Sequence, residues 1–158
     1  MIESKYIKPF IEATIKVLET MAFTTPTVGE SRIWEPEHSV GEVAGIVGLS
    51  NEDETIKGFL SIGFSAGSII QIVSNMFGEE YESMNEEVRE AVGEIANMIS
   101  GQARQALSSL DIKLQGSLPT IISGNKLEIE GTEKKPMVMV PCSVEKGAFE
   151  LAICIEGI

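Results

Sequence analysis

The order of hydrophobic patterns along the chain limits its fold more than any other feature. A helical apolar pattern over residues 4–22 is followed by three strand-like runs, a short and a long helical pattern, and three further strand-like runs. This order predicts one unit, a helix followed by three strands, that is used twice. The segments TPTV (25–28) and LPTI (118–121) occupy the same place in each half. We therefore expect an α+β fold in which pseudo-duplicated units pack long helices against a mostly antiparallel sheet.

The strand-like runs differ in strength. In the first half, TVGESRIWE is the weakest, GEVAGIVGLS is rich in Val, Ile and Gly, and KGFLSIGFS alternates, with Leu60, Ile62 and Phe64 on one face. The second half carries KLQGSLPTIIS, MVMVPCSVE and AFELAICIE. Pro119 and Pro141 fall within these runs. Proline cannot donate a ladder hydrogen bond, so both positions predict sheet edges or bulges.

Three helices are predicted. The first covers about 4–22, with Pro9 near its start, and the second is the short amphipathic segment AGSIIQIVSNMFG, ended by Gly78. The third covers about 83–110 and opens with Ser83 and Glu86, which have the spacing of a capping box.

Length and charge restrict the class of protein. A chain of 158 residues suits one domain, predicted over residues 1–158. It has 12 Lys plus Arg against 24 Asp plus Glu, a net charge of -12. Nucleic-acid binding depends on basic patches, so we expect no nucleic-acid partner. The same charge argues against an anionic membrane surface, and no apolar run approaches the ~20 residues of a membrane helix.

The cysteines and the N-terminal segment predict a cytoplasmic location. Cys142 and Cys154 lie in apolar strand-like runs, as buried, reduced thiols do. The first residues include Glu3 and no apolar stretch, so we expect no signal peptide. His38, the only histidine, lies in a polar loop and has no Cys/His spacing around it that would indicate a metal site.

The long helix has two contrasting faces. Its apolar stripe consists of Val88, Ala91, Val92, Ile95, Met98, Ile99, Ala103, Ala106 and Leu110. Its opposite side carries Glu87, Glu90, Glu94, Asn97, Gly101, Arg104 and Ser108. Residues three apart are neighbours on a helix surface, so Glu94 and Asn97 are expected to point outward together.

This polar side has two interpretations. It is either a solvated face with incidental glycines or a docking face. Gly93 and Gly101 each cost a helix about 1 kcal/mol relative to alanine, and Asn97 is a poorer helix former than Glu, Lys or Gln. A surface without side chains lets another backbone come close. An amide can donate to and accept from one water at once, which fixes the orientation of that water for attack.

The residues EAVGEIAN, followed by LPTI, resemble the signature of the CheC/CheX/FliY phosphatase family. Glu94, Asn97 and Pro119 match that signature, and Glu90 takes its leading position, where the family more often has Asp or Ser. The order of elements resembles the family over nearly the whole chain.

The resemblance implies a reaction, the hydrolysis of the aspartyl phosphate on a CheY-like receiver domain. It implies that Asn97 orients the attacking water and that Glu94 bridges to the lysine of the receiver. It also implies that the receiver holds Mg²⁺ and that this chain binds no cofactor or metal. On the docking face around this pair, we expect Glu90, Gly93, Gly101 and Arg104 to contact the partner.

The number of Glu–Asn pairs in the chain indicates which branch of the family it resembles most. Glu94 and Asn97 lie 25 and 22 positions before Pro119. The same steps back from Pro26, the matching proline of the first half, reach Met1 and Ser4, so the first half lacks the pair. One site per chain is most similar to the CheX branch of the family, which implies a homodimer joined through sheet edges.

Two other functions stay open. The same face suits a non-catalytic module that binds a receiver or a flagellar component. The segment GFSAG (63–67), with Ser65 at its centre, is superficially similar to a GxSxG nucleophile elbow, but no triad order emerges around His38.

Overall fold

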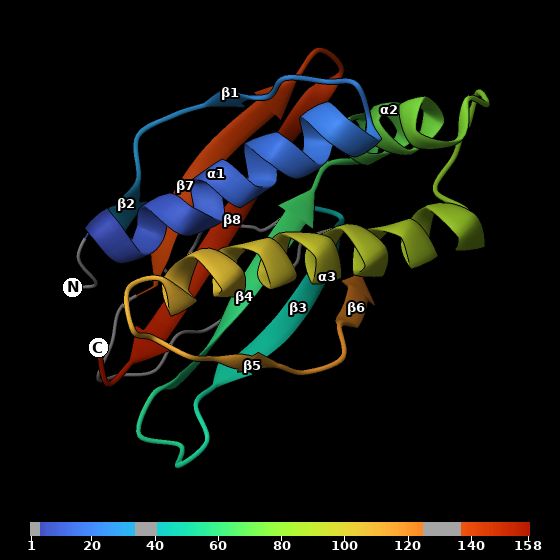
Figure 1. Ribbon diagram of the computed structural model, residues 1–158. Coiled ribbons are helices and arrows are strands. Elements are labelled where there is room, and N and C mark those ends of the chain that lie inside the picture. The colour runs from blue at the N-terminus through green and yellow to red at the C-terminus, as the bar shows by residue number, and fades with distance from the viewer. Residues whose placement is uncertain (1–3, 34–40, 125–136) are drawn as a thin grey trace.

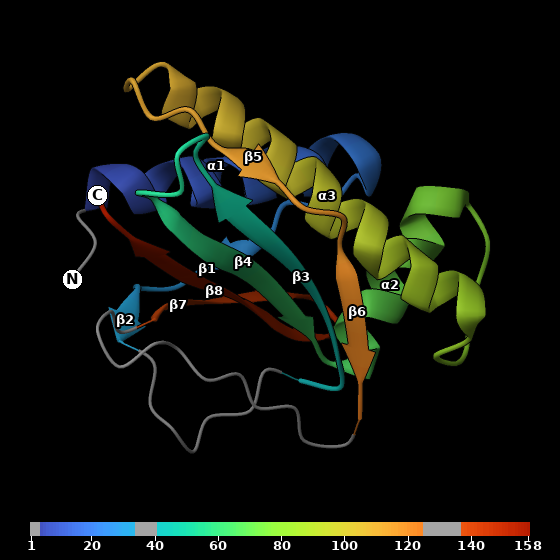
Figure 2. The same ribbon diagram turned by 90° about the horizontal axis from the view of Figure 1, so that it is seen from below.

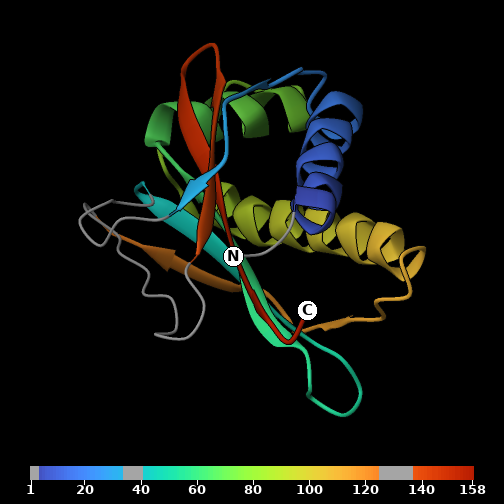
Figure 3. The ribbon, with the colours of Figure 1, turned by 90° about the vertical axis from the view of Figure 1, so that its left-hand side faces the viewer.

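In the described part of the chain, three helices cover one face of a sheet, as Figures 1 and 3 show. The structure is a computed structural model that describes residues 4–33, 41–124 and 137–158. His38 therefore lies outside the described residues. The helices are α1 (Ser4–Met21), α2 (Ala66–Phe77) and α3 (Glu86–Ser108). None of them is long and apolar enough to cross a membrane, as judged over the described residues.

The sheet has eight strands, and every described strand pair is antiparallel. The first half supplies β1 (Thr27–Val28), β2 (Arg32–Ile33), β3 (Val43–Ser50) and β4 (Lys57–Phe64). The second half supplies β5 (Gln115–Gly116), β6 (Thr120–Ser123), β7 (Val138–Val144) and β8 (Gly147–Glu156). The predicted α+β fold with helices on a mostly antiparallel sheet is confirmed.

The pairing shows how the two halves interlock. The order is β1-β7-β8-β4-β3-β5, with β2 also on β7 and β6 also on β3. The short strands β1 and β2 of the first half therefore pair with the second half, and β5 and β6 of the second half pair with the first. The strands β4 and β8 meet at the centre (Figure 2). This exchange is the arrangement expected of a duplicated unit, and it makes the two halves depend on each other.

Alternation along the central strands sets the face that the helices cover. Leu60 pairs with Ile153 across β4 and β8, and both are buried in the main core together with Ile62, Leu151 and Ile155 on the same face. Phe64 and Phe149 close this row, with ring centroids 5.4 Å apart. The predicted face of β4 is thus the core face, because alternate strand side chains point to the same side.

The two prolines in the second half lie at different places. Pro119 immediately precedes β6, which among the described strands pairs with β3 alone. Pro141 lies inside β7, between the residues that pair with β1 and those that pair with β2. There its carbonyl accepts a hydrogen bond of 2.8 Å from the Gly29 N–H. Pro141 thus sits where the neighbouring strand is interrupted, since it has no N–H to donate.

Both ends of α3 differ from the expectation. The N-cap of α3 is Asn85, whose side chain accepts from the Val88 N–H at 2.9 Å. The capping box predicted at Ser83 is therefore wrong by two residues. The helix also ends before Leu110, which is 45% exposed.

Ser65 has a structural role at the start of α2. Its hydroxyl oxygen accepts a hydrogen bond of 3.2 Å from the Ser68 N–H, which makes it the N-cap of that helix. An N-cap explains why a serine follows β4 and precedes α2, so the similarity of GFSAG to a nucleophile elbow reflects helix capping.

Candidate functional site

The site lies on α3, which the sheet and α1 hold in place. Its inner face is fully buried, with Val92, Ile95 and Ala96 in the core. A glycine of β3 allows this close packing, because a Cβ at Gly45 would lie 3.0 Å from the Ala96 Cβ and 3.2 Å from the Val92 backbone oxygen. A helix pinned this closely offers its outer residues from a rigid support.

Glu94 and Asn97 lie on the outer face of α3, and both are exposed. The predicted outward placement is confirmed. Within the described residues, neither side chain makes a hydrogen bond or an ion pair with another part of the chain. One carboxylate and one amide are therefore available to an incoming molecule.

The structure corrects the expected placement of Gly93. This glycine is buried, and a Cβ there would lie 3.0 Å from Ile121 Cδ1 and 3.6 Å from Pro119 Cγ. The expectation that it contributes to a partner-facing surface is wrong, because the neighbour that comes close is the β6 segment of the same chain.

Gly101 differs from Gly93. A Cβ at this position would meet only the Arg104 Nη2, at 3.9 Å. No packing of the described residues requires glycine here, so its contact with a partner stays a prediction.

Arg104 already has contacts within the chain. Its Nε donates to the Ser100 Oγ at 3.2 Å, and its guanidinium lies against Gly116 of β5, where a Cβ would come within 3.0 Å of Cζ and Nε. The side chain is half-buried. Arg104 therefore connects α3 to β5, and its predicted role toward a partner is a further proposal.

Pro119 supports the site from beside it. It lies against α3 at Gly93, one residue before Glu94. Ser117, two residues before Pro119, attaches this segment to β3. Its Oγ accepts from the Gly48 N–H at 2.8 Å, and its own N–H donates to the Gly48 carbonyl at 2.9 Å. Sequence reasoning missed Ser117, whose position in an SLPT segment gives no signal for this pairing.

Sequence reasoning also missed a groove beside Glu94. It has a volume of about 590 Å³, and both Glu90 and Glu94 line it, together with residues from the ends of α1 and α2. Glu90 is exposed, as expected from its place on the polar side of the helix. Met21, the last residue of α1, is 40% exposed and lines this groove.

Among the described residues of the first half, the helix offers no equivalent pair. The helix α1, which takes the place of α3 in that half, contains no asparagine. Among the described residues, no group of three or more His, Cys, Asp or Glu side chains could hold a metal ion. The structure thus defines a class of protein, an α+β domain that presents one carboxylate and one amide on an exposed helix face.

Comparison with known proteins identifies the family. The family described as "Chemotaxis phosphatase CheX" matches residues 43–143, more than half of the chain. This chain therefore belongs to the CheX family of chemotaxis phosphatases, within the wider CheC/CheX/FliY group. The matched part holds α3 with Glu94 and Asn97, as well as Pro119.

Individual relatives agree with this assignment. The chain is 34% identical over 97 residues to the CheY-P phosphatase CheX of Thermotoga maritima, which is 61% of this chain and 59% of that relative. The match thus spans less than two thirds of the length of that relative. The crystal structure of the chemotaxis protein CheX from Vibrio vulnificus has a TM-score of 0.90 and 31% identity, covering 96% of this chain and 99% of that one.

The fold of this chain also occurs in a CheX structure that was solved as a complex with CheY. The CheX chain of the CheX–CheY–BeF3–Mg complex from Borrelia burgdorferi has a TM-score of 0.79, with 96% of this chain and 97% of that chain covered. At 23% identity this likeness shows the fold alone.

Proposed function

We propose that this protein hydrolyses the aspartyl phosphate of a CheY-like receiver domain. The observation that carries the proposal is the state of Glu94 and Asn97, which are exposed on a rigidly packed helix and have no partner among the described residues. The named relative from Thermotoga maritima is a CheY-P phosphatase, and the Borrelia burgdorferi relative forms a complex with CheY, BeF3 and Mg.

The proposed roles divide between the two side chains. The Asn97 amide would donate to and accept from one water, and so align it with the phosphorus of the receiver. Phosphoryl transfer depends mainly on positioning and charge stabilisation, so one well-placed amide is enough when the other groups are present. The Glu94 carboxylate would pair with the receiver lysine and set the register of the amide. In this proposal the receiver supplies the aspartyl phosphate and Mg²⁺.

The test measures phosphate loss from a panel of phosphorylated receivers in the presence of Mg²⁺. Wild-type protein should accelerate the loss for at least one receiver, and Asn97→Ala should remove about 100-fold or more of that acceleration. Asn97→Asp keeps the shape but loses the N–H donors, so it should be similarly impaired. Gln105→Ala is the matched control, because it removes another exposed amide from the same helix.

Folding is not expected to complicate this test. Asn97 is exposed, and alanine is the better helix former, so the thermal unfolding temperature of Asn97→Ala should not fall. An Asn97→Ala variant with full activity would disprove the water-orienting role. A receiver that binds without any change in its phosphate lifetime would favour the alternative, a non-catalytic binding module.

Assembly and location extend this proposal. The family resemblance implies a homodimer joined through sheet edges, and the described sheet ends at β1 and β2 on one side and at β5 and β6 on the other. The location proposed from the cysteines and the N-terminal segment is the cytoplasm. Light scattering during size-exclusion chromatography would measure the mass of the assembly, and a monomer at micromolar concentration would contradict the dimer.

A further inference from the structure

A groove next to the Glu94–Asn97 pair has an apolar floor. The groove floor consists of Met21 from α1, Met76 and Phe77 from α2, and Met98 from α3. Phe77 is 53% exposed, and Met76 and Met98 are half-buried against the main core. Unbranched methionine side chains adapt to the shape of what they contact, so such a floor suits an apolar side chain from another molecule.

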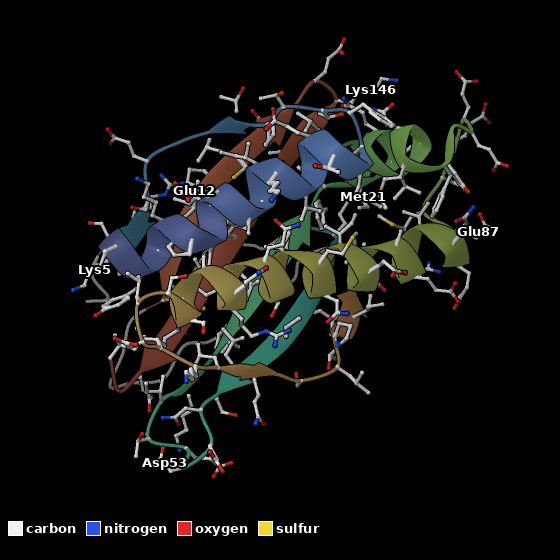
Figure 4. The ribbon with its side chains drawn as sticks, in the orientation of Figure 1. Lys5, Glu12, Met21, Asp53, Glu87 and Lys146 are labelled. Carbon is white, nitrogen blue, oxygen red and sulfur yellow. The ribbon has the colours of Figure 1, made fainter. Side chains whose placement is uncertain are left out.

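The rim of this groove is acidic. It carries Glu79, Glu87, Glu90 and Glu94, and no lysine or arginine is among the described residues that line the groove. Figure 4 labels Met21 at the end of α1 and Glu87 in the first turn of α3, at the same end of the molecule. Like charges around an apolar floor raise the local negative potential, which attracts a cationic partner and repels an acidic one.

One part of the rim is held in place within the chain. The Tyr81 hydroxyl donates to the Glu87 Oε2 at 2.6 Å, and the Tyr81 ring lies 6.2 Å from the Phe77 ring. The hydrogen bond to Glu87 raises the pKa of Tyr81 above its usual value. In contrast, Glu90 and Glu94 have no cationic partner among the described residues, so their carboxylates are available.

The groove and the proposed active site share a residue. Glu94 lines the groove, and Met98 of the floor follows Asn97 directly on α3. A partner that brings its phosphate to Asn97 would therefore cover part of the groove. Because the groove continues into the site at Asn97, the molecule that reaches the groove is the one that the proposed function places on Asn97, the receiver.

From this arrangement we infer that the groove takes a segment of the phosphorylated receiver in which an apolar side chain stands beside lysine or arginine. The inference rests on the proposed function, because it identifies the occupant as the receiver. The apolar side chain lies on the methionine floor, and the basic groups face the glutamate rim. The groove thereby selects which receivers this protein serves, whereas Asn97 acts on the phosphate.

The test separates binding from chemistry with steady-state kinetics on a receiver that the wild-type protein dephosphorylates. Phe77→Ser and the double variant Glu79→Lys/Glu90→Lys should each raise KM about tenfold and leave kcat within about twofold, because they weaken docking without touching the water site. The double variant should also reduce the dependence of KM on salt concentration.

Matched controls exist for both variants. Phe23→Ser changes a phenylalanine that is 80% exposed and does not line the groove. Glu30→Lys/Glu52→Lys makes the same change in net charge at two exposed positions outside the groove. Both controls should leave KM unchanged. The groove variants alter exposed side chains, and thermal unfolding would confirm that they fold.

A second measurement distinguishes failure of this inference from failure of the proposed function. Anisotropy of a labelled receiver, activated with beryllofluoride and Mg²⁺, reports binding to an Asn97→Ala background without turnover. Weaker binding of the groove variants supports the inference even when the wild-type protein shows no phosphatase activity. Groove variants that bind and react normally overturn it, and leave the proposed function intact if Asn97→Ala is inactive. Absence of both binding and activity with every receiver overturns both.

Discussion

A methyl group added to Gly93 would lie 3.0 Å from the Cδ1 of Ile121. This relationship joins the helix that carries the proposed catalytic pair to the segment that carries the motif proline. Ile121 is 37% exposed and belongs to β6, which is paired with β3. The glycine of the motif therefore permits the chain to pack on itself directly beside Glu94.

Gly93→Ala and Gly101→Ala should consequently differ in stability. Both replace a glycine inside α3, where alanine is worth about 1 kcal/mol. At Gly101 the new methyl meets only the Arg104 Nη2 at 3.9 Å, so this variant should gain most of that amount. At Gly93 the methyl crowds Ile121, and overpacking costs about 1–3 kcal/mol. Urea unfolding should place Gly93→Ala at least ~1 kcal/mol below Gly101→Ala, and equal stabilities would contradict the packing role.

The N-terminal cap of α3 gives a second comparison. Asn85 accepts from the Val88 N–H, whereas Ser83 lies outside the helix. Loss of an N-cap costs about 0.5–2 kcal/mol, typically ~1. Asn85→Ala should lower the free energy of unfolding by about that amount, and Ser83→Ala should change it by less than ~0.5 kcal/mol. Circular dichroism during thermal unfolding measures both, and a larger loss from Ser83→Ala would restore the capping box that the sequence predicted.

Periodicity predicted the elements well and their ends poorly. The stripe through Val92, Ile95 and Ile99 required a buried helix face, and the structure confirms this because an apolar stripe has to be covered. The predicted cap, Ser83, and the observed cap, Asn85, are two residues apart in the sequence. The choice between them depends on where α3 meets the core, and local pattern carries no such information.

For the candidate site, too, the sequence predicted the features that belong to one helix and missed those that depend on contacts between distant segments. The spacing of Glu94 and Asn97 is a property of one helix, so the sequence predicted their common outward direction. The burial of Gly93 depends on Ile121 of β6, which lies about 28 positions later in the chain. It also depends on the pairing of β6 with β3. The groove beside Glu94 combines three helices, and none of its methionines is distinguishable from a core residue in the sequence.

Cys142 predicts how stability depends on pH. Burial, with a smaller contribution from the Glu150 carboxylate, raises the pKa of this thiol from 9.0 to about 12. In the unfolded chain the thiol loses its proton near pH 9, but in the folded protein it keeps it. The free energy of unfolding should therefore be unaffected by this group below pH 9 and fall between pH 9 and 12, by at most about 1.4 kcal/mol per pH unit. Urea unfolding at pH 8 and pH 10.5 should show a smaller decrease for Cys142→Val than for the wild type, and parallel decreases would exclude the thiol as the cause.

The last comparison separates the two glutamates that are one turn apart on α3. Glu94 and Glu90 are both exposed and both line the groove, so removal of either charge changes the rim equally. If Glu94 pairs with a lysine in a desolvated contact, Glu94→Gln leaves that lysine without its partner, which costs about 2–5 kcal/mol. A charge that stays on the solvated rim is worth at most about 1 kcal/mol.

Single-turnover rates over a range of protein concentrations should thus show a loss in kcat/KM of about 30-fold or more for Glu94→Gln. For Glu90→Gln the loss should be at most about fivefold, and it should disappear at high salt, because screening removes the contribution of solvated charges. The Glu94→Gln loss should persist at high salt, since a desolvated pair is screened much less. Equal losses for the two variants would mean that Glu94 contributes only its charge to the rim, and the assigned bridge to the receiver lysine would have to be abandoned.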